Sequence, residues 1–565
     1  MTNAASTKLI LDYVYEHEEE HPSKTYLTQP LGHGKVVDYS WGEVLEQARR
    51  MATYLKSQGC GEGTQVAILS KNCAYFFMAE LAIWMAGGTT VSIFPTESAE
   101  TIRYVLEHSE AKMIFIGKLD TWQQQSAGVP AHVARIIMPL APRIDGAKWE
   151  EILVKNRPIA GKPARKPDDL AMLIYTSGST GQPKGVMHNF QRITRAVESV
   201  INVSKLQPEE RFISYLPLAH VVERTFVECG TLIGGGHVFF ADSLATFMED
   251  VKRARPTIFL SVPRLWLKFQ EGVLAQMPAK KLDFLLKIPV IKKIVSRKVL
   301  EGLGLDQARL AGSGTAPIPA ELLAWYQRLG LNLLEGYGMT EDFACSHLSS
   351  DAHHEIGFVG VACPGVQVRI SDDGEVLIKS PGQLVGYFKR PELTQECFTE
   401  DGFFRTGDQG YLRADGMLKI TGRLKEIFKT GKGKYVAPAP IENQLNAHPL
   451  IELSLVSGVG KESAYAMVLL KEERRIQLLQ AASEGSKQRL LRSQMEAQLE
   501  QLLADVNQEL VSYEQLHMLV VVSDPWTIEN GCLTPTMKIK RSRIEAKVTE
   551  QLDGWYASGK KVVWF

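Results

Sequence analysis

Residues 175–185 combine the residue types that hold a polyphosphate. They read Tyr-Thr-Ser-Gly-Ser-Thr-Gly-Gln-Pro-Lys-Gly and include three glycines, four hydroxyl side chains and Lys184. Glycine lets the backbone approach a ligand closely and turn through positive φ. Hydroxyl groups and bare amide N–H groups can then face an anion, and the lysine adds a positive charge. The stretch therefore predicts a phosphate-binding loop, with a flexible Gly/Ser surface loop as the plain alternative.

The loop lacks the spacing of the common nucleotide-binding P-loop. That motif needs glycine, four residues, and then Gly-Lys-Ser/Thr. The fifth position after Gly178 is Pro183, and Lys184 is followed by Gly185. The spacing excludes an ordinary kinase or NTPase loop.

Three further stretches carry groups that suit a nucleotide and a metal ion. Residues 335–341 read Glu-Gly-Tyr-Gly-Met-Thr-Glu, so two glycines would let the Tyr337 ring lie flat against a base. A hard cation takes carboxylate and phosphate oxygens, which suits Glu341. Residues 401–411 contain Asp408, an acceptor-only carboxylate that suits a diol. Lys538 lies in the tail string 533–541. Taken singly, each could be an ordinary turn, a surface acid or a tail lysine.

Together these stretches resemble the motifs of the adenylate-forming superfamily, which includes acyl-CoA synthetases, firefly-luciferase-like enzymes and peptide-synthetase adenylation domains. They follow the family's order from Tyr175 to Lys538. In residues 311–318, Thr315 replaces the family's usual second glycine. The resemblance implies that ATP or AMP is bound by Thr176, Ser177, Gly178, Ser179, Thr180, Gly181, Lys184, Ser313, Gly314, Gly336, Tyr337, Gly338, Thr340, Asp408, Arg423 and Lys538.

The resemblance also implies roles in catalysis. Thr176 and Glu341 would hold Mg²⁺, and the catalytic groups would be Lys538, Glu341 and Lys184. A cation at the α-phosphate would offset the charge that builds up in the transition state. Lys538 matches the family's catalytic lysine and Lys540 does not, while Lys425 matches the hinge position between two domains.

Two stretches, 216–224 and 261–266, resemble long-chain fatty acyl-CoA synthetases. His220 would lie near the substrate carboxylate, although a histidine of this kind could also belong to the core. The basic loop 427–438 would line the thioester site through Lys429 and Gly433, or else be a solvated basic loop.

The implied activity is a long-chain fatty acid–CoA ligase that uses ATP, Mg²⁺ and coenzyme A. The alternatives are an acyl-AMP ligase that serves a carrier protein or another acceptor, and an inactive binding module. Retention of the charged motif residues argues against the inactive module.

Composition fits a cytoplasmic enzyme of small molecules. The 565 residues carry 64 basic and 64 acidic side chains, so no global charge favours nucleic acid, and we expect no obligate protein partner. Seven scattered cysteines without a CxxC pair indicate reduced thiols. The N-terminus lacks a signal pattern, and the apolar run Tyr75–Pro95 contains Glu80 and falls short of a membrane span.

Periodicity predicts an α/β fold. Helix-like and strand-like segments alternate over the first third of the chain, which favours parallel strands with crossover helices. The Asp-Gly turns of residues 366–420 predict an antiparallel, barrel-like piece, and residues 472–510 read as one charged helical stretch before a strand at 516–522. The resemblance implies a large N-terminal region of two α/β sheets plus a small barrel (1–422) and a small mobile α+β domain (423–565).

The basic stretch 280–305 has two interpretations. It mixes seven lysines and arginines with large apolar residues, which suits a helix lying on the inner, anionic face of a membrane. The alternative, which we favour from the sequence, is a helix with a solvated lysine face.

Overall fold

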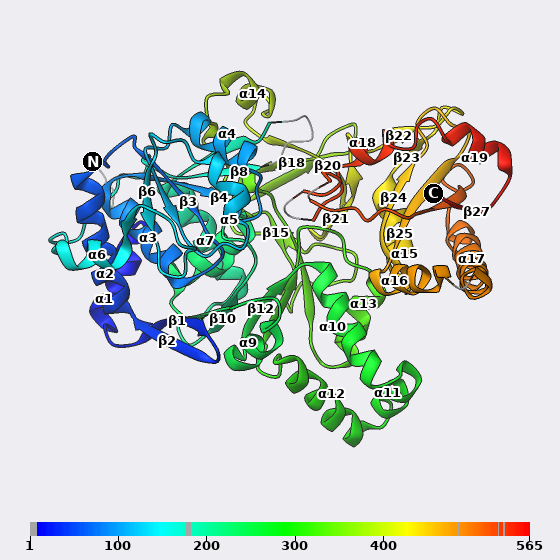
Figure 1. Cartoon of the computed structure of the whole chain (residues 1–565), viewed down its shortest axis with the longest axis horizontal. Helices are drawn as coiled ribbons and strands as arrows, with labels where there is room; N and C mark the ends of the chain where they lie inside the picture. Colours follow the sequence, from blue (N-terminus) through cyan, green and yellow to red (C-terminus); the bar gives the residue numbers. More distant parts are fainter. Residues whose placement is uncertain (1–7, 177–181, 484, 529, 535–536) are drawn as a thin grey trace.

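The computed structural model describes residues 8–176, 182–483, 485–528, 530–534 and 537–565. Figure 1 shows two sheet-containing parts along the long axis, with residues 423–565, here called the C-terminal region, at the right. The predicted α/β class is confirmed.

An eight-stranded sheet forms the centre of the N-terminal part. Its order is β19 (Gly386–Tyr387), β9 (Lys184–Asn189), β8 (Leu170–Thr176), β4 (Thr89–Ile93), β3 (Gln65–Leu69), β5 (Met113–Ile116), β6 (Ala134–Ile137) and β7 (Ala147–Lys148). Strands β3 to β8 run parallel, as the alternating pattern predicts, whereas β9 and β19 pair antiparallel at one edge. The crossover helices are α3 (Ala74–Ala86) and α4 (Ala99–Ser109), while α2 (Trp41–Ser57) precedes β3 and packs on α3. The segment after the phosphate loop, which reads as helical, is strand β9, and helix α7 (Phe190–Ser204) follows only after it.

Three smaller sheets complete this part. One has the order β10 (Arg211–Ser214), β11 (His237–Phe240), β1 (Thr25–Gly32) and β2 (Lys35–Ser40). The second has the order β12 (Ile258–Ser261), β13 (Leu310–Ser313), β14 (Leu333–Tyr337), β15 (His347–Leu348) and β16 (Val361–Ala362). The third, β17 (Gln367–Ile370), β18 (Glu375–Lys379), β20 (Phe404–Leu412) and β21 (Leu418–Arg423), is the antiparallel piece that the Asp-Gly turns predict.

The C-terminal region has its own sheet and core. Its strands are β24 (Ile451–Ser457), β25 (Ala464–Leu470), β26 (Leu516–Val522) and β27 (Val562–Trp564), beside a short hairpin of β22 (Phe428–Lys429) and β23 (Tyr435–Val436). Two buried apolar clusters contain only residues from Phe428 onward. The helical stretch 472–510 is two helices, α16 (Glu472–Gln480) and α17 (Gly485–Glu509), with α15 (Pro438–Asn446) nearby in the chain.

The remaining helices lie at the periphery or between sheets. They are α1 (Ile10–Glu20), α5 (Trp122–Gln125), α6 (Trp149–Lys155), α8 (Cys229–Gly234), α9 (Phe247–Ala254), α10 (Pro263–Gln276), α11 (Ala279–Leu286), α12 (Pro289–Leu303), α13 (Ala320–Arg328), α14 (Pro391–Glu396), α18 (Arg541–Glu545) and α19 (Leu552–Ser558). The basic stretch 280–305 therefore forms two helices, because Pro289 begins the second.

The most apolar helix of the chain is a core helix. Every residue of α3 is buried, including Glu80, whose carboxylate pairs with the buried guanidinium of Arg224. A charge inside a core needs such a partner. Within the described residues, no helix combines the length and apolar character that crossing a bilayer requires.

Candidate active site

The predicted phosphate loop connects two paired strands. Thr176 ends β8, and Lys184 opposite it begins β9, so the hairpin register fixes the two residues side by side. Ser177, Gly178, Ser179, Thr180 and Gly181, predicted to contact phosphate, lie outside the described residues.

The end of β13 offers a polar group without a protein partner. Ser313 is buried, and its Oγ makes no hydrogen bond within the described chain. A Cβ added to Gly314 would lie 3.4 Å from the carbonyl oxygen of Gly336, so this turn runs beside the end of β14. Thr315 has φ +70°, a left-handed conformation that favours glycine. A threonine at this position therefore adds backbone strain to the turn.

Tyr337 is tied to the predicted ribose-binding acid. Its hydroxyl donates to Asp408 Oδ2 at 2.7 Å, and Arg423 Nε lies 3.2 Å from Oδ1. Asp408 and Arg423 meet because they are directly opposite in the β20–β21 ladder. Burial raises the pKa of Asp408, and the Arg423 charge opposes that rise. Each carboxylate oxygen has two lone pairs, so both can still accept a ligand hydroxyl.

The glycines beside Tyr337, Gly336 and Gly338, let the backbone pass close to residues 344–348. A Cβ on Gly338 would stand 2.8 Å from the Cα of Ala344, closer than side chains tolerate. A Cβ on Gly336 would meet the Leu348 side chain at 2.9 Å. Gly338 is therefore required because the clash is with backbone, whereas at Gly336 the Leu348 side chain would have to move.

Glu341 lies in a 3₁₀ turn (Thr340–Asp342) held from two sides. The Tyr387 hydroxyl donates to Glu341 Oε1 at 2.8 Å. His188 Nε2 lies 2.8 Å from the carbonyl oxygen of Thr340, and burial lowers the pKa of His188 to about 4. The neutral imidazole therefore donates to that carbonyl. The sequence reading missed His188 and Tyr387, which carry no motif signal of their own.

The same tyrosine connects Glu341 to the phosphate loop. The Lys184 ammonium lies 5.3 Å from the centre of the Tyr387 ring, a cation–π distance. Lys184, predicted to bind phosphate, thus lies over the Tyr387 ring, and Glu341, predicted to bind the metal, accepts from its hydroxyl.

The donor set of this region fits a nucleotide-bound magnesium ion. In the described residues no cluster of three or more histidine, cysteine or acidic side chains could hold a metal by itself. Mg²⁺ in phosphate-transfer sites is usually held by one or two carboxylates together with substrate phosphates. Glu341 supplies one such carboxylate.

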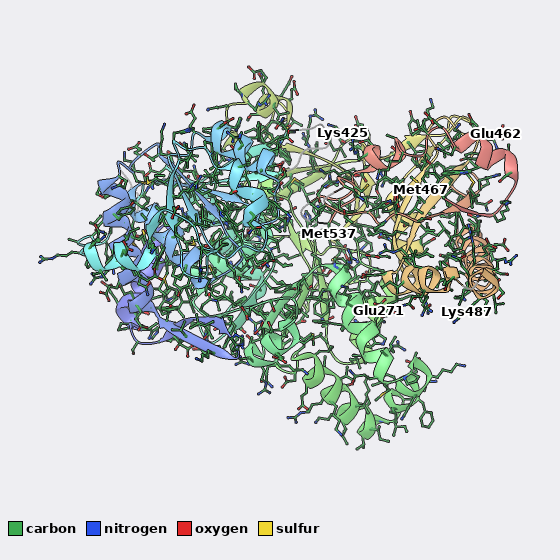
Figure 2. All side chains as sticks on the ribbon, viewed as in Figure 1. Glu271, Lys425, Glu462, Met467, Lys487 and Met537 are labelled. Carbon is green, nitrogen blue, oxygen red and sulfur yellow. The ribbon has the colours of Figure 1, made fainter. Side chains whose placement is uncertain are left out.

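Lys538 belongs to the C-terminal region but lies within electrostatic reach of residues that the sequence predicts to bind the nucleotide. Its N–H donates to Thr534 Oγ1 at 3.0 Å, and Met537 turns the chain with φ +62°. The charges of Arg423, Asp408 and Glu341 all act on its ammonium. Figure 2 shows the neighbouring Met537 between the two parts of the molecule.

The environment of Lys538 lowers its pKa. Crowding by protein is the main cause and the nearby Arg423 charge adds to it, while Asp408 opposes the change. Lys538 is nevertheless an exposed residue, so its ammonium remains accessible to water. Such a group can meet an incoming anion without first leaving a buried pair.

His220 of the N-terminal part lies within electrostatic reach of Lys538. Val222 N–H donates to its Nδ1 at 3.3 Å, so the ring proton resides on Nε2. Burial lowers the pKa of His220 to about 4, and the Lys538 charge acts in the same direction. The Phe94 ring lies 6.5 Å away at an edge-on angle. His220 is therefore neutral at neutral pH, and Lys538 supplies the positive charge on this side.

The predicted thioester loop lies elsewhere. The Lys429 carbonyl accepts from Gly460 N–H at 3.2 Å, and Gly431 N–H donates to the Lys461 carbonyl at 2.7 Å. Gly433 has φ +78° at the tip. Among the described residues, these contacts join the loop to residues 460–461, and none joins Lys429 or Gly433 to Lys538.

Ion pairs join α10 to the C-terminal region. Lys471 pairs with Glu271, and Glu452 pairs with both Arg264 and Arg475. Figure 2 labels Glu271 on the central part of the molecule, facing that region. These pairs favour the arrangement in which Lys538 lies beside the N-terminal part.

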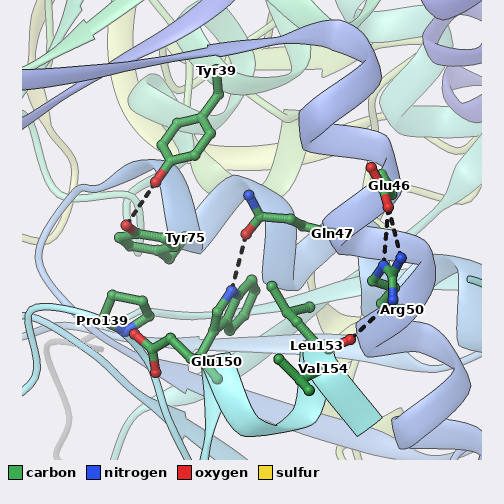
Figure 3. Close-up of a pocket in the computed structure, with 10 residues that line it drawn as sticks. Tyr39, Glu46, Gln47, Arg50, Tyr75, Pro139, Glu150, Leu153 and Val154 are labelled. Carbon is green, nitrogen blue, oxygen red and sulfur yellow. Dashed lines mark hydrogen bonds and ion pairs between the residues drawn. The ribbon is translucent and has the colours of Figure 1, made fainter. Parts of the chain in front are cut away.

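One cavity lies away from all these groups. It has a volume of about 480 Å³ and is lined by residues of α2, α6 and their surroundings (Figure 3). Its polar groups satisfy one another: Tyr39 and Tyr75 share a 2.8 Å hydrogen bond, and Trp149 Nε1 donates to Gln47 at 3.1 Å. It contains none of the predicted site residues.

Comparisons with known proteins agree on the fold and the family. The AMP-binding enzyme family matches residues 14–388, and the AMP-binding enzyme C-terminal domain matches residues 426–560. A long-chain-fatty-acid–CoA ligase of Mycobacterium bovis is 31% identical over 96% of each chain. Long-chain-fatty-acid–CoA ligase 5 of Rattus norvegicus is 30% identical over 92% of this chain and 84% of its own. The adenylation domain of a Mycobacterium chelonae carboxylate reductase superposes with a TM-score of 0.80 at 24% identity, covering 98% of this chain and 92% of that one.

Proposed function

The chain belongs to the AMP-binding enzyme family, and from that premise we propose that it is an AMP-forming ligase that joins a long-chain fatty acid to coenzyme A. The observation that carries this proposal is that Lys538 of the C-terminal region lies within electrostatic reach of His220, Asp408, Arg423 and Glu341, with Asp408 bonded to Tyr337 and Arg423. The names of relatives that align over nearly the whole chain support the acyl class.

In the first step, a carboxylate oxygen of the fatty acid attacks the α-phosphorus of ATP. The bond to the β-phosphate oxygen breaks, which yields acyl-AMP and pyrophosphate. Tyr337 would pack on the adenine and Asp408 would accept the ribose hydroxyls. Lys538 would offset the charge that builds up between the carboxylate and the α-phosphate. Neutral His220 would contact the substrate carboxylate without competing for that charge.

Mg²⁺ would be held by Glu341, as the family resemblance implies, and would neutralise phosphate charge. Thr176 is the second predicted ligand. Tyr387 holds the Glu341 carboxylate, and Lys184 lies across the same ring, so this chain orients both groups before substrate arrives.

In the second step, the thiolate of coenzyme A attacks the acyl carbonyl and displaces AMP. For this step, the basic loop with Lys429 and Gly433 would have to reach the residues around His220, where the acyl carbonyl would lie. It does not do so in the present arrangement, so we propose that residues 423–565 move as a lid domain about Lys425, on a body formed by residues 1–422.

A panel of acids tests the activity. Short, long and aromatic acids are supplied with ATP and coenzyme A, and AMP and thioester are measured separately. We expect AMP and thioester in equal amounts, with long chains preferred. AMP without thioester would instead indicate an acyl-AMP ligase that serves another acceptor, and absence of AMP with every acid would indicate an inactive binding module.

Glu341→Gln should shift the Mg²⁺ dependence of adenylation to higher concentration. The amide oxygen can still accept from the Tyr387 hydroxyl, so the melting temperature without ligand should change little. The loss of one negative charge should weaken only the binding of Mg²⁺. ATP–pyrophosphate exchange is measured across a Mg²⁺ titration.

Glu209→Gln, at an exposed position, is the matched control and should leave the titration unchanged. An unaltered titration in Glu341→Gln would show that Glu341 has a structural role and does not hold Mg²⁺.

A reducing compartment, the cytoplasm, is the proposed location. All seven cysteines are described, and each is a free thiol. Reduced thiols are the rule in that compartment.

A further inference from the structure

The backbone that carries His220 is an irregular turn. Strand β10 ends at Ser214, and residues 215–220 belong to no helix or strand. Leu218, in the middle of this segment, is fully buried. Buried backbone groups outside a helix or sheet need other hydrogen-bond partners. The side chains around the turn must therefore supply them.

Asn72, between β3 and α3, supplies two of these partners and is itself buried. Its Nδ2 donates to the Leu216 carbonyl at 2.6 Å, and its Oδ1 accepts from Leu218 N–H at 3.2 Å. The same Nδ2 lies 3.1 Å from Glu223 Oε1, which also accepts from Tyr215 N–H at 3.1 Å. A planar amide with both a donor and an acceptor is suited to hold two points of one turn.

Arg224 holds the turn through a further bond. Its Nε donates to the Leu218 carbonyl at 2.6 Å, so both backbone groups of Leu218 are held by buried side chains. The guanidinium pairs with Glu80 of α3 and lies 3.1 Å from Glu228. Arg224 and Glu228 belong to the π-helix Glu223–Glu228, a rare conformation that is frequent at functional sites.

The place of His220 depends on this turn. His220 N–H donates to the Pro217 carbonyl at 2.8 Å, and the His220 carbonyl accepts from Arg224 N–H at 3.3 Å. The imidazole accepts from Val222 N–H. These hydrogen bonds all lie within residues 217–224, so they fix the ring only if that segment is itself held by the rest of the protein.

We propose that Asn72 and Arg224 are positioning residues for the activation of the acid, and that they act through the turn that carries His220. The inference rests on the proposed contact of His220 with the substrate carboxylate and names the residues that set its place. A displacement of about 1 Å between reacting groups costs about 10² in rate. If the two side chains served the fold alone, their loss would lower stability without affecting the acid more than ATP.

Kinetics with a long-chain acid and with ATP test the role. In ATP–pyrophosphate exchange, Asn72→Ala should lower kcat/KM for the acid by about 10²-fold and leave the KM for ATP unchanged. Arg224→Lys is a second, independent variant. It keeps a charge beside Glu80 and Glu228, but one ammonium does not reproduce the guanidinium fork, so the acid should again be affected more than ATP.

Asn507→Ala is the matched control. Asn507, on α17, also holds both backbone groups of one residue, because its Nδ2 donates to the Leu516 carbonyl at 2.9 Å and its Oδ1 accepts from Leu516 N–H at 2.8 Å. The same two kinds of bond are lost, but in the C-terminal region. Both kinetic parameters should remain unchanged.

Two further measurements separate positioning from stability. In a His220→Ala background, Asn72→Ala should lower kcat/KM for the acid by less than about twofold, because effects that act through one group are not additive. Hydrogen exchange of residues 215–220, followed without substrate, should be faster in Asn72→Ala, because Leu218 N–H loses its acceptor.

Four outcomes would overturn the inference. They are an equal effect on acid and ATP, an undiminished loss in the His220→Ala background, wild-type rates in His220→Ala itself, and unchanged hydrogen exchange in Asn72→Ala. Absence of AMP with every acid would instead contradict the ligase activity, and hydrogen exchange, which needs no substrate, would still decide whether Asn72 holds the turn.

Discussion

Lys538→Ala should lose acid-dependent ATP–pyrophosphate exchange by about 10²–10³ in rate while still converting supplied acyl-AMP and coenzyme A to thioester. Only the first half-reaction builds charge at the α-phosphate, and removal of one preorganised contact to such a charge costs about this much. The backbone bonds between residues 534 and 538 do not involve the lysine side chain, so the hairpin should persist. The two half-reactions are measured separately.

Lys540→Ala is the control for this prediction. Lys540 lies two residues away in the same exposed tail, and its charge acts on Glu97 rather than on the nucleotide residues. Its effect on exchange should be mild. Equal loss of both half-reactions in Lys538→Ala would contradict the assigned role.

Lys425→Pro should separate the half-reactions in the opposite sense. Lys425 lies in the turn that follows β21, and among the described hydrogen bonds its amide has no acceptor. Proline removes that donor and fixes φ near −65°. The present arrangement therefore loses no bond, but rotation through this residue is blocked. Pyrophosphate exchange should remain, whereas thioester formation from acyl-AMP should fall about 10²-fold, the scale set by mispositioned reactants.

The matching control is Lys425→Ala, which keeps the backbone free and should slow overall turnover only slightly. A folded proline variant that keeps both half-reactions, or loses both, would show that the lid does not turn about this residue. Melting temperature and circular dichroism establish that each variant is folded.

Local patterns predicted the fold well where hydrophobic periodicity was strong. The alternation of helices and strands predicted for the first third of the chain is present from α2 to β5. Residues 472–510, predicted as one helical stretch, form two helices with the 3₁₀ turn Ala481–Ser483 after the first, a division that helical periodicity does not signal.

The candidate site was predictable only where motifs carry the chemistry. The β20–β21 register brings Asp408 and Arg423 together, and Tyr337 at the end of β14 reaches Asp408 through a hydrogen bond. His188 and Tyr387 could not be found, because a single histidine in a strand and a tyrosine in an apolar run look like core residues. Their function depends on which turn packs over them, and one sequence does not reveal that.

The ion pairs between α10 and the C-terminal region set an equilibrium rather than a lock. Glu271 and Arg264 keep 41% and 36% of their side-chain surface exposed, and pairs of this kind contribute about 0–1 kcal/mol each. Together the two pairs favour the present arrangement by at most about thirtyfold over one in which both are broken. Salt screens such pairs. If residues 423–565 move as proposed, ionic strength should therefore act as a conformational effector, shifting the ratio of the two arrangements without touching either set of reacting groups.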